Sequence, residues 1–348
     1  MQKGRAPSEI HADPIFVVGS PRSGTTLLYH MLVSTGAFLD YRAETHFFDL
    51  FLPRYGDPRS ARRREALADA WLGSSYHART GLEDPQLRGQ LLERGTTPGR
   101  FLAFIMAQAA DAQSRPRWAD CTPAHVRHMD SIKREIPSAR FLHIVRDGRD
   151  VALSLAPRGW ARPLPWDRRN LELVAAWAWQ YDVEIGRRLG AKLGRNAYHE
   201  VRFEELVRDT GSTLEGLSDF VETPLGLAAL QRAPVGSVVQ PNTSFQDAGG
   251  DFDPVGRWKT HMDRSDLEKI EATVGATLRA CGYSTTTDRR AGLPLRARHQ
   301  VAKQAEGLRA FLKNRTPLAR LVIDPLTAAP PLTLPEDPPT RDSDSTSS

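Results

Sequence analysis

Cysteine is scarce in this chain of 348 residues, and the two that occur, Cys121 and Cys281, lie far apart in the sequence. Two cysteines are too few for a disulfide framework or a cysteine-based metal cluster. Long apolar runs are also absent: none reaches the length of about 20 residues that a transmembrane helix needs. The opening sequence MQKGRAPSEIHADP has no apolar region like that of a signal peptide. We therefore expect a soluble, cytoplasmic protein without a transmembrane segment.

Clusters of basic residues are missing as well, although the chain carries a formal net charge of +5 and has a pI of about 9.3. No run of lysine and arginine and no aromatic-basic repeat indicates a nucleic-acid surface, so we expect no nucleic-acid partner. The mild positive charge fits a small anionic ligand instead. No set of metal ligands is visible, so we expect no metal ion.

The sequence does contain an anion-binding pattern near its beginning, in DPIFVVGSPRSGTTLLYHMLVST. It predicts a buried strand over Ile15–Val18, a tight loop over Gly19–Gly24 and a helix that opens at Thr25. At a helix N-terminus, the backbone N–H groups and the helix dipole both favour negative charge. The loop adds further phosphate donors, namely Arg22 and the hydroxyls of Ser23, Thr25 and Thr26.

This loop differs in one respect from the ATP-binding P-loop, G-x-x-x-x-G-K-[ST]. Gly19 and Gly24 have the required spacing, but Thr25 stands where the P-loop has lysine, and the cation has moved to Arg22. Because the P-loop lysine reaches the β- and γ-phosphates of a triphosphate, its absence disfavours ATP and favours a single 5′-phosphate. A P-loop kinase of a small molecule remains an alternative, as does a nucleotide-binding protein without catalysis.

A second anion-binding pattern follows much later, in RFLHIVRDGRDVALSL. Arg140–Val145 is a short apolar run typical of a buried strand, and a helix follows it from Asp147. Ligands of open α/β sheets bind at the carboxyl ends of the strands, so Arg146 and Ser154 can face the same crevice as the first loop. A kinase needs an Asp at such a strand end to hold Mg²⁺, whereas Arg146 would repel the metal.

We expect an α/β fold of the P-loop-like type, with three layers, α/β/α, and a central parallel sheet of about four or five strands. Ala37–Asp40 and Ala197–Phe203 are further candidates for short strands. Residues 56–115 are predicted to be mainly helical. Thr122 is expected to cap a helix whose first turn contains Pro123.

The two anion-binding patterns resemble those of sulfotransferases that use 3′-phosphoadenosine 5′-phosphosulfate (PAPS). PRSGTT at residues 21–26 is similar to the family's 5′-phosphosulfate loop, P-[KR]-[ST]-G-[TS]-T, and the later pattern is similar to its 3′-phosphate element. AYHEVRFEELVRDT resembles a strand and acidic turn of the family, and Gly256-Arg-Trp-Lys259 resembles its late basic loop. The resemblance implies PAPS as the donor, with the cofactor-binding residues Arg22, Ser23, Gly24, Thr25, Thr26, Arg146, Ser154, Arg158 and Arg257.

The same resemblance implies a catalytic base. Glu44-Thr-His-Phe-Phe-Asp49 resembles the K-E-x-H-F-F-D segment of heparan-type glycan sulfotransferases and the E-T segment of protein-tyrosine sulfotransferases, where that Glu is the proposed base. We therefore predict Glu44 as the base, His46 as the weaker alternative, and Arg22 as the cation at the leaving phosphate. Ala43 replaces a lysine, and Asp120-Cys-Thr-Pro123 replaces E-K-[TS]-P, so two cations near the acceptor are absent and a polyanionic glycan is disfavoured.

The predicted reaction is in-line transfer of the sulfuryl group from PAPS to a hydroxyl or amine of a small-molecule, glycan or peptide acceptor. The variable segments 50–115, 156–170 and 231–256 are expected to line the acceptor pocket. The predicted organisation comprises an N-terminal extension, a sulfotransferase domain, a basic helical extension and a Pro/Ser/Asp-rich tail typical of disorder, at residues 1–13, 14–283, 284–315 and 316–348.

Overall fold

The centre of the described part of the molecule is a sheet of four strands, each parallel to its neighbours. The structure is a computed structural model, and it describes residues 13–158, 170–226 and 253–315. Within those residues the strand order is β2-β1-β3-β4. The strands are β1 (Ile15–Gly19), β2 (Ala119–Asp120), β3 (Arg140–Val145) and β4 (Tyr198–Arg202). This confirms the predicted α/β fold with a central parallel sheet.

The register of the strands brings the two anion-binding patterns together. Ile15 of β1 lies opposite Arg140 of β3, and Gly19 lies opposite Ile144, so both strands end at the same edge of the sheet. The loop after β1 and the turn after β3 are therefore neighbours, although more than a hundred residues separate them in the sequence.

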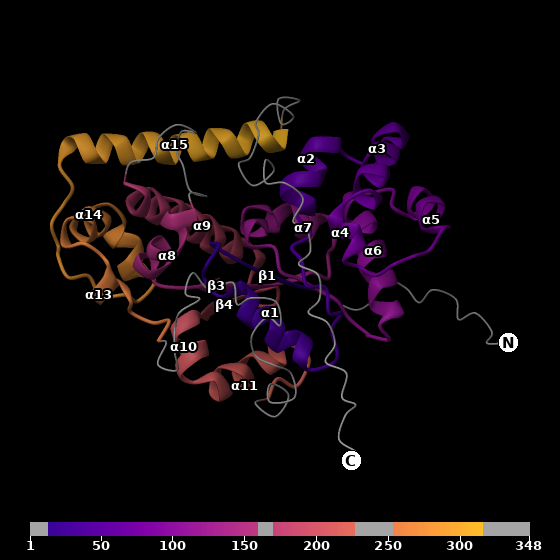
Figure 1. The fold of residues 1–348 in the computed structure, drawn as a ribbon, viewed down its shortest axis with the longest axis horizontal. Coiled ribbons are helices and arrows are strands. Elements are labelled where there is room, and N and C mark those ends of the chain that lie inside the picture. Colours follow the sequence, from indigo (N-terminus) through magenta and orange to yellow (C-terminus); the bar gives the residue numbers. More distant parts are fainter. Residues whose placement is uncertain (1–12, 159–169, 227–252, 316–348) are drawn as a thin grey trace, which may run out of the picture.

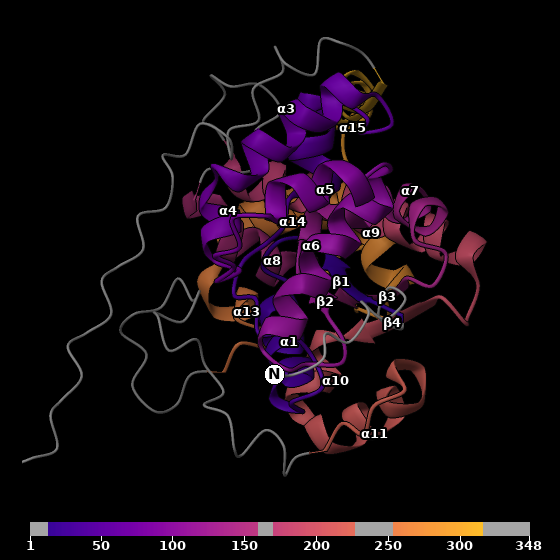
Figure 2. The ribbon, with the colours of Figure 1, turned by 90° about the vertical axis from the view of Figure 1, so that its right-hand side faces the viewer.

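Both faces of the sheet are covered, because alternate residues of a strand point to opposite sides. Ile15 and Val17 pack with α1 (Thr25–Ser34), α10 (Phe203–Arg208) and α11 (Thr210–Val221). Figures 1 and 2 show these three helices below the sheet and the long helix α9 above it.

The opposite face carries most of the helices. Phe16 and Val18 pack there with the helices that lie between α1 and β3 in the chain. These are η1 (Phe47–Phe51), α2 (Leu52–Tyr55), α3 (Ala61–Leu72), α4 (Ser75–Ala78), α5 (Leu87–Arg94), α6 (Pro98–Ala112), η2 (Pro123–His128) and α7 (Met129–Glu135). A further cluster joins the end of β3 to α8 (Gly148–Leu155), α9 (Leu171–Leu193) and α14 (Arg264–Ala280). Residues 56–115 are thus mainly helical, as predicted.

One local prediction was wrong: residues 37–40 form no strand, and Phe38 makes only an isolated bridge with Arg117. Thr122 is the N-cap residue of the 3₁₀-helix η2, and Pro123 lies in its first turn, as predicted. The Thr122 hydroxyl makes no capping hydrogen bond within η2; it accepts one from the backbone N–H of Thr45 at 2.9 Å.

The C-terminal part of the described chain packs against this core. After η3 (Ala156–Arg158) and the two helices α13 (Trp258–His261) and α14, helix α15 (Leu293–Arg315) contacts α9, α14 and α2. The ring of Trp177 on α9 stacks on His299 of α15, with ring centroids 5.1 Å apart.

No helix in the described ranges is both long and apolar enough to cross a membrane. The predicted tail over 316–348 and most of the predicted acceptor loops over 156–170 and 231–256 lie outside the described residues.

Candidate active site

The loop between β1 and α1 adopts a backbone conformation that restricts its sequence. Gly24 has a φ of 98°, and a Cβ placed there would lie 2.4 Å from the ring of Phe203, so only glycine fits. Arg22 has a φ of 72°, which is uncommon for a residue with a side chain. Strained residues of this kind cluster at functional sites.

Arg22, Arg146 and Ser154 meet at the carboxyl edge of the sheet, as the sequence predicts. The Nε of Arg22 donates to the Oγ of Ser154 at 2.9 Å, and Nη1 of Arg146 donates to the carbonyl oxygen of Arg22 at 3.0 Å. The guanidinium of Arg146 also lies over the ring of Phe203, 4.5 Å from its centroid.

Two more of the predicted arginines lie within electrostatic range. Burial, Arg158 and Arg146 together lower the pKa of Arg22 to about 10. Burial lowers the pKa of Arg146, and Arg257 lowers it further. Burial and neighbouring cations thus destabilise the charges of Arg22 and Arg146, and an anion bound there would stabilise them.

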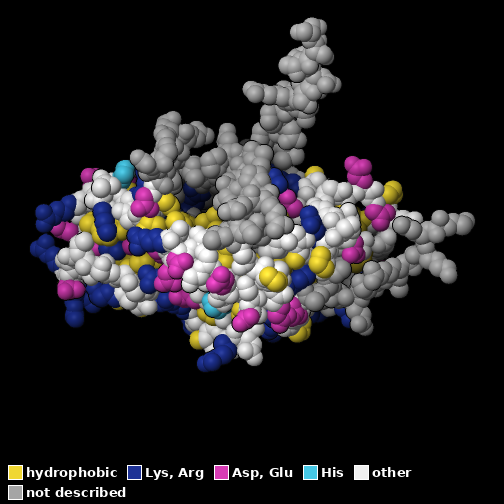
Figure 3. All heavy atoms as spheres, turned by 90° about the horizontal axis from the view of Figure 1, so that it is seen from below, with side chains coloured by type: hydrophobic (Ala, Val, Ile, Leu, Met, Phe, Trp, Pro, Cys, Tyr) yellow, Lys and Arg dark blue, Asp and Glu magenta, His cyan; other side chains and the backbone are white. Residues whose placement is uncertain are grey.

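The positive charge extends to the surface of the same end of the molecule. Many lysine and arginine side chains gather at the left end of the face in Figure 3, the end where Figure 1 places α13 and α14. The exposed basic residues of that part of the chain include Lys259, Arg264, Arg279 and Arg289. Such a field would draw an anionic ligand toward this end.

The hydroxyl residues of the loop differ in their surroundings. The Ser23 side chain is buried, and its Oγ has no hydrogen-bond partner in the described part of the chain. Thr25, the first residue of α1, is buried and close enough to Cys121 to lower the pKa of its thiol. Thr26 is half-buried at the same helix end. Ser23 therefore has a donor ready for a ligand.

Glu44 lies on the Thr25 side of the loop. Burial raises the pKa of the Cys121 thiol, and the neighbouring Glu44 carboxylate raises it further. Because Thr25 also influences this thiol, Cys121 lies near both Glu44 and the start of α1. The Glu44 side chain is 44% exposed, and its Oε2 lies 2.9 Å from Nε2 of His46. This carboxylate therefore faces both solvent and His46.

His46 is held between two carboxylates. Its Nδ1 lies 3.0 Å from Oδ2 of Asp49, opposite the contact with Glu44. Burial alone would lower the pKa of His46, but Asp49 and Glu44 outweigh it and raise the pKa well above its usual value. His46 also has a φ of 48°, a second strained residue among those predicted for the site.

The chain of charged groups continues beyond the residues that the sequence pointed to. The fully buried His125 lies 3.5 Å from Asp49 through Nε2 and 3.0 Å from Asp120 through Nδ1. Asp120 also accepts hydrogen bonds from the Thr45 hydroxyl and the backbone N–H of Thr122. The sequence analysis did not identify His125, because it lies 79 residues beyond His46. The histidine that closely follows the Asp-Cys-Thr-Pro segment was the pattern that could have indicated it.

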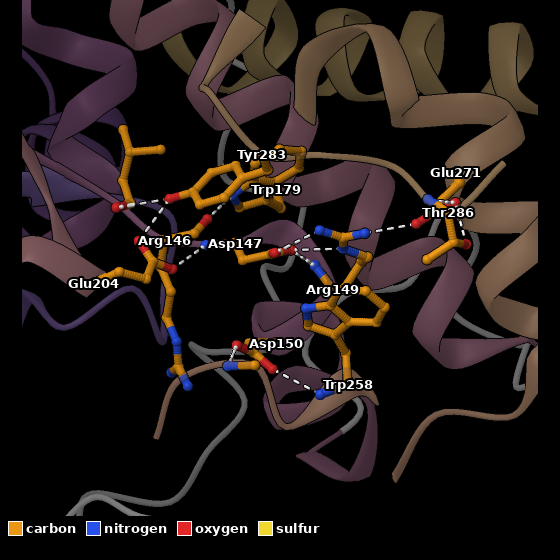
Figure 4. Close-up of polar contacts among 12 residues, drawn as sticks. Arg146, Asp147, Arg149, Asp150, Trp179, Glu204, Trp258, Glu271, Tyr283 and Thr286 are labelled. Carbon is orange, nitrogen blue, oxygen red and sulfur yellow. Dashed lines mark hydrogen bonds and ion pairs between the residues drawn. The ribbon is translucent and has the colours of Figure 1, made fainter. Parts of the chain in front are cut away.

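Asp150 is another residue that the sequence did not reveal. It lies one turn beyond Arg146, and its carboxylate accepts hydrogen bonds from the backbone N–H groups of Gly256 and Trp258 (Figure 4). These hydrogen bonds bring Arg257 to the arginine cluster.

Among residues 13–158, 170–226 and 253–315, no group of His, Cys, Asp and Glu is arranged to hold a metal ion.

The family assignment follows from the sequence match. The model of the sulfotransferase family matches residues 14–226, more than half of the chain, including the loop after β1, Glu44 and the turn after β3. The chain belongs to the sulfotransferase family. It is thus related to transferases that move sulfuryl groups. No curated protein matches the sulfotransferase chain.

Solved structures of sulfotransferases are similar to this one. The sulfotransferase domain from the curacin biosynthetic pathway is 17% identical, with a TM-score of 0.55; the match covers 80% of this chain and 100% of that one. The sulfotransferase domain of the Synechococcus PCC 7002 olefin synthase is 20% identical, with a TM-score of 0.46 and coverage of 87% and 98%. STF9 from Mycobacterium avium is 15% identical, with a TM-score of 0.44 and coverage of 80% and 79%. The curacin domain shares the fold.

Proposed function

We propose that this chain transfers a sulfuryl group from PAPS to a hydroxyl or amine of an acceptor, with Glu44 as the general base. The acceptor is a small molecule, a glycan or a peptide. The observation that carries the proposal is the arginine cluster at the carboxyl edge of the sheet. Arg22, Arg146, Arg158 and Arg257 lie within electrostatic range of one another or of a shared neighbour, although they come from three separate parts of the chain.

The donor set fits a nucleotide that carries phosphate at two positions. The loop after β1 offers its backbone N–H groups, the buried Ser23 hydroxyl and the helix N-terminus at Thr25 for a 5′-phosphosulfate. Arg146 and Ser154 stand at the second strand end, where a 3′-phosphate would find a charged and a neutral donor. PAPS, when bound, supplies the sulfuryl group.

The remaining roles belong to residues of this chain. Arg22 would neutralise charge on the departing phosphate oxygen, because a cation in a buried site stabilises developing negative charge strongly. Glu44 would accept the proton of the attacking hydroxyl or amine.

Between the two candidate bases, the electrostatics favour Glu44. His46 is flanked by Glu44 and Asp49, its pKa is raised well above the usual value, and a protonated imidazole has no lone pair with which to accept a proton. We assign His46 the role of orienting the Glu44 carboxylate, which it contacts at 2.9 Å.

The test is transfer of labelled sulfate from PAPS to a library of acceptors, in the presence of EDTA. Wild type should turn over, and Glu44→Gln, which keeps the size and removes the base, should cut turnover by about 10²–10⁴-fold. Its affinity for adenosine 3′,5′-bisphosphate should stay near that of wild type, since no phosphate contact is assigned to Glu44. His46→Ala should lose less.

Two results would contradict the proposal. If Glu44→Gln stays within a few-fold of wild type while His46→Ala is inactive, Glu44 is not the base. If EDTA abolishes activity and Mg²⁺ restores it, the chemistry is that of a kinase rather than of a metal-independent sulfotransferase.

A further inference from the structure

The family match ends at residue 226, yet the arginine cluster is completed by a segment beyond it. Nη2 of Arg146 donates to the carbonyl oxygen of Pro254 at 2.5 Å, and Asp150 accepts from Gly256 N at 2.7 Å and Trp258 N at 2.9 Å. We name residues 254–258 the clasp segment. Figure 4 shows it below the start of α8, with Asp150 directed toward Trp258.

Both carboxylate oxygens of Asp150 accept hydrogen bonds from this segment. Oδ2 accepts one from the backbone N–H of Gly256, and Oδ1 accepts one from the backbone N–H of Trp258. The side chain is 2% exposed, and its burial raises the pKa of Asp150. A carboxylate in so poorly hydrated a place costs free energy unless hydrogen bonds and nearby cations offset the cost. The two N–H groups and Arg146 supply that compensation.

Asp150 also lies within electrostatic range of two cations that repel each other. It favours the charged form of both Arg146 and Arg257, whereas Arg257 disfavours the charged form of Arg146. With Asp150 present, the two arginines can approach the same place before any anionic ligand arrives. Without it, their mutual repulsion would push the clasp segment away from β3.

A second contact holds the far end of the clasp segment. The guanidinium of Arg149 lies over the Trp258 ring, 3.6 Å from its centroid. Arg149 is itself fixed from two sides, by Asp147 with Nη2–Oδ2 at 2.7 Å and by Glu271 of α14 with Nη1–Oε1 at 2.6 Å (Figure 4). The other oxygen of Glu271 accepts from the backbone N–H and the hydroxyl of Thr286. Helices α8, α13 and α14 are thereby joined around Trp258.

We infer that Asp150 is a positioning residue for the nucleotide: it anchors the clasp segment so that Arg257 and Arg146 converge on the 3′-phosphate. This inference rests on the proposed function, because it assumes a ligand with a 3′-phosphate. Both carboxylate oxygens of Asp150 are bonded to backbone N–H groups, so its effect on the nucleotide passes through the two arginines.

The direction in which the affinity for the bisphosphate changes on substitution of Asp150 distinguishes a positioning role from a direct effect of its charge on the phosphate. If Asp150 acted only as a negative charge near the phosphate, its neutralisation in Asp150→Asn would tighten binding of an anion. If it positions the clasp segment, Asp150→Asn loses one of two N–H acceptors and binding weakens. Asp150→Glu also distinguishes the two roles, because it keeps the charge and moves the carboxylate by one methylene group.

The experiment is calorimetric titration of wild type, Asp150→Asn and Asp150→Glu with adenosine 3′,5′-bisphosphate and with AMP. Both variants should bind the bisphosphate about tenfold more weakly, the loss expected for a charged hydrogen bond, while AMP affinity changes by about twofold or less. Hydrogen exchange in the peptide 253–262 should become faster in both. The control is Asp209→Asn, since Asp209 likewise accepts a backbone N–H, from Ser212 at the start of α11; it should match wild type.

The outcomes are distinct. Bisphosphate binding by Asp150→Asn that equals or exceeds that of wild type overturns the positioning role, as does an equal loss for AMP. If Asp150→Asn does not fold, Asp150→Glu decides the question, and wild-type affinity in it rejects the inference. If wild type itself binds the bisphosphate no better than AMP, the proposed function has failed instead.

Discussion

At the scale of single residues, His125 shows that this fold buries ionisable side chains in contact with one another. The side chain has no exposed surface, yet it lies between Asp120 and Asp49. Burial alone would lower its pKa, but the two carboxylates outweigh burial and raise the pKa to about 9. The raised pKa favours the imidazolium, and His125 and its carboxylates form a buried chain of contacts that reaches Glu44 through His46.

This arrangement predicts a pH dependence of stability. Because the folded pKa of about 9 exceeds the unfolded value of 6.5, the stabilisation is complete below pH 6.5 and is lost as pH rises through 9. The loss should amount to up to about 3 kcal/mol, since each pKa unit corresponds to about 1.4 kcal/mol. Urea unfolding of wild type and His125→Gln between pH 6 and pH 10 measures it.

The free energy of unfolding of His125→Gln should fall less between pH 6 and pH 10 than that of wild type, because the variant lacks the titrating imidazole. The control is His261→Gln, at an exposed histidine of α13, which should follow wild type. Parallel curves for wild type and His125→Gln would show that His125 is neutral in the folded protein.

At the scale of elements, the loop between β1 and α1 depends on Gly24. Its φ of 98° and the 2.4 Å approach of a Cβ to Phe203 leave no room for a side chain. Gly24→Ala should therefore cost about 2 kcal/mol or more from strain and overpacking, and should weaken binding of adenosine 3′,5′-bisphosphate.

Gly216 offers a matched control for that substitution. It lies in α11 with nothing within 4 Å of an added Cβ, so Gly216→Ala should stabilise the protein slightly, by about 0.5–1 kcal/mol. Urea unfolding and calorimetric titration of both variants give the comparison. If Gly24→Ala is as stable and binds as well as Gly216→Ala, the loop does not hold the conformation described here.

The same elements show what the sequence can predict. The strand predicted over Ile15–Val18, which the structure extends to Gly19, the helix from Thr25 and the strand over 140–145 were predictable because apolar pattern and glycine spacing agree locally. The π-helix Phe47–Phe51 was not, because it follows a strained His46 that tertiary contacts hold in place. Asp150 was also beyond prediction: its bonds to Gly256 and Trp258 span more than a hundred residues, and nothing near Asp150 signals them.

At the scale of the whole molecule, the parallel sheet gathers cations from distant segments at one edge. The loop after β1 supplies Arg22, the turn after β3 supplies Arg146, the end of η3 supplies Arg158 and the residue before α13 supplies Arg257. Their convergence follows from the parallel register of β1 and β3 and from the packing of α13 against α8. The account therefore predicts one ligand whose charges are spread over two positions.

The most direct test of this central claim is calorimetric titration of wild type and Arg146→Ala with adenosine 3′,5′-bisphosphate and AMP, without divalent metal. Wild type should bind the bisphosphate about ten- to a hundredfold more tightly than AMP, since a charged hydrogen bond contributes about 1.5–3 kcal/mol. Arg146→Ala should lose most of that preference while keeping its affinity for AMP, and Ser154→Ala should act in the same direction less strongly. Equal affinity of wild type for the two nucleotides, or an equal loss of both in Arg146→Ala, would contradict the account.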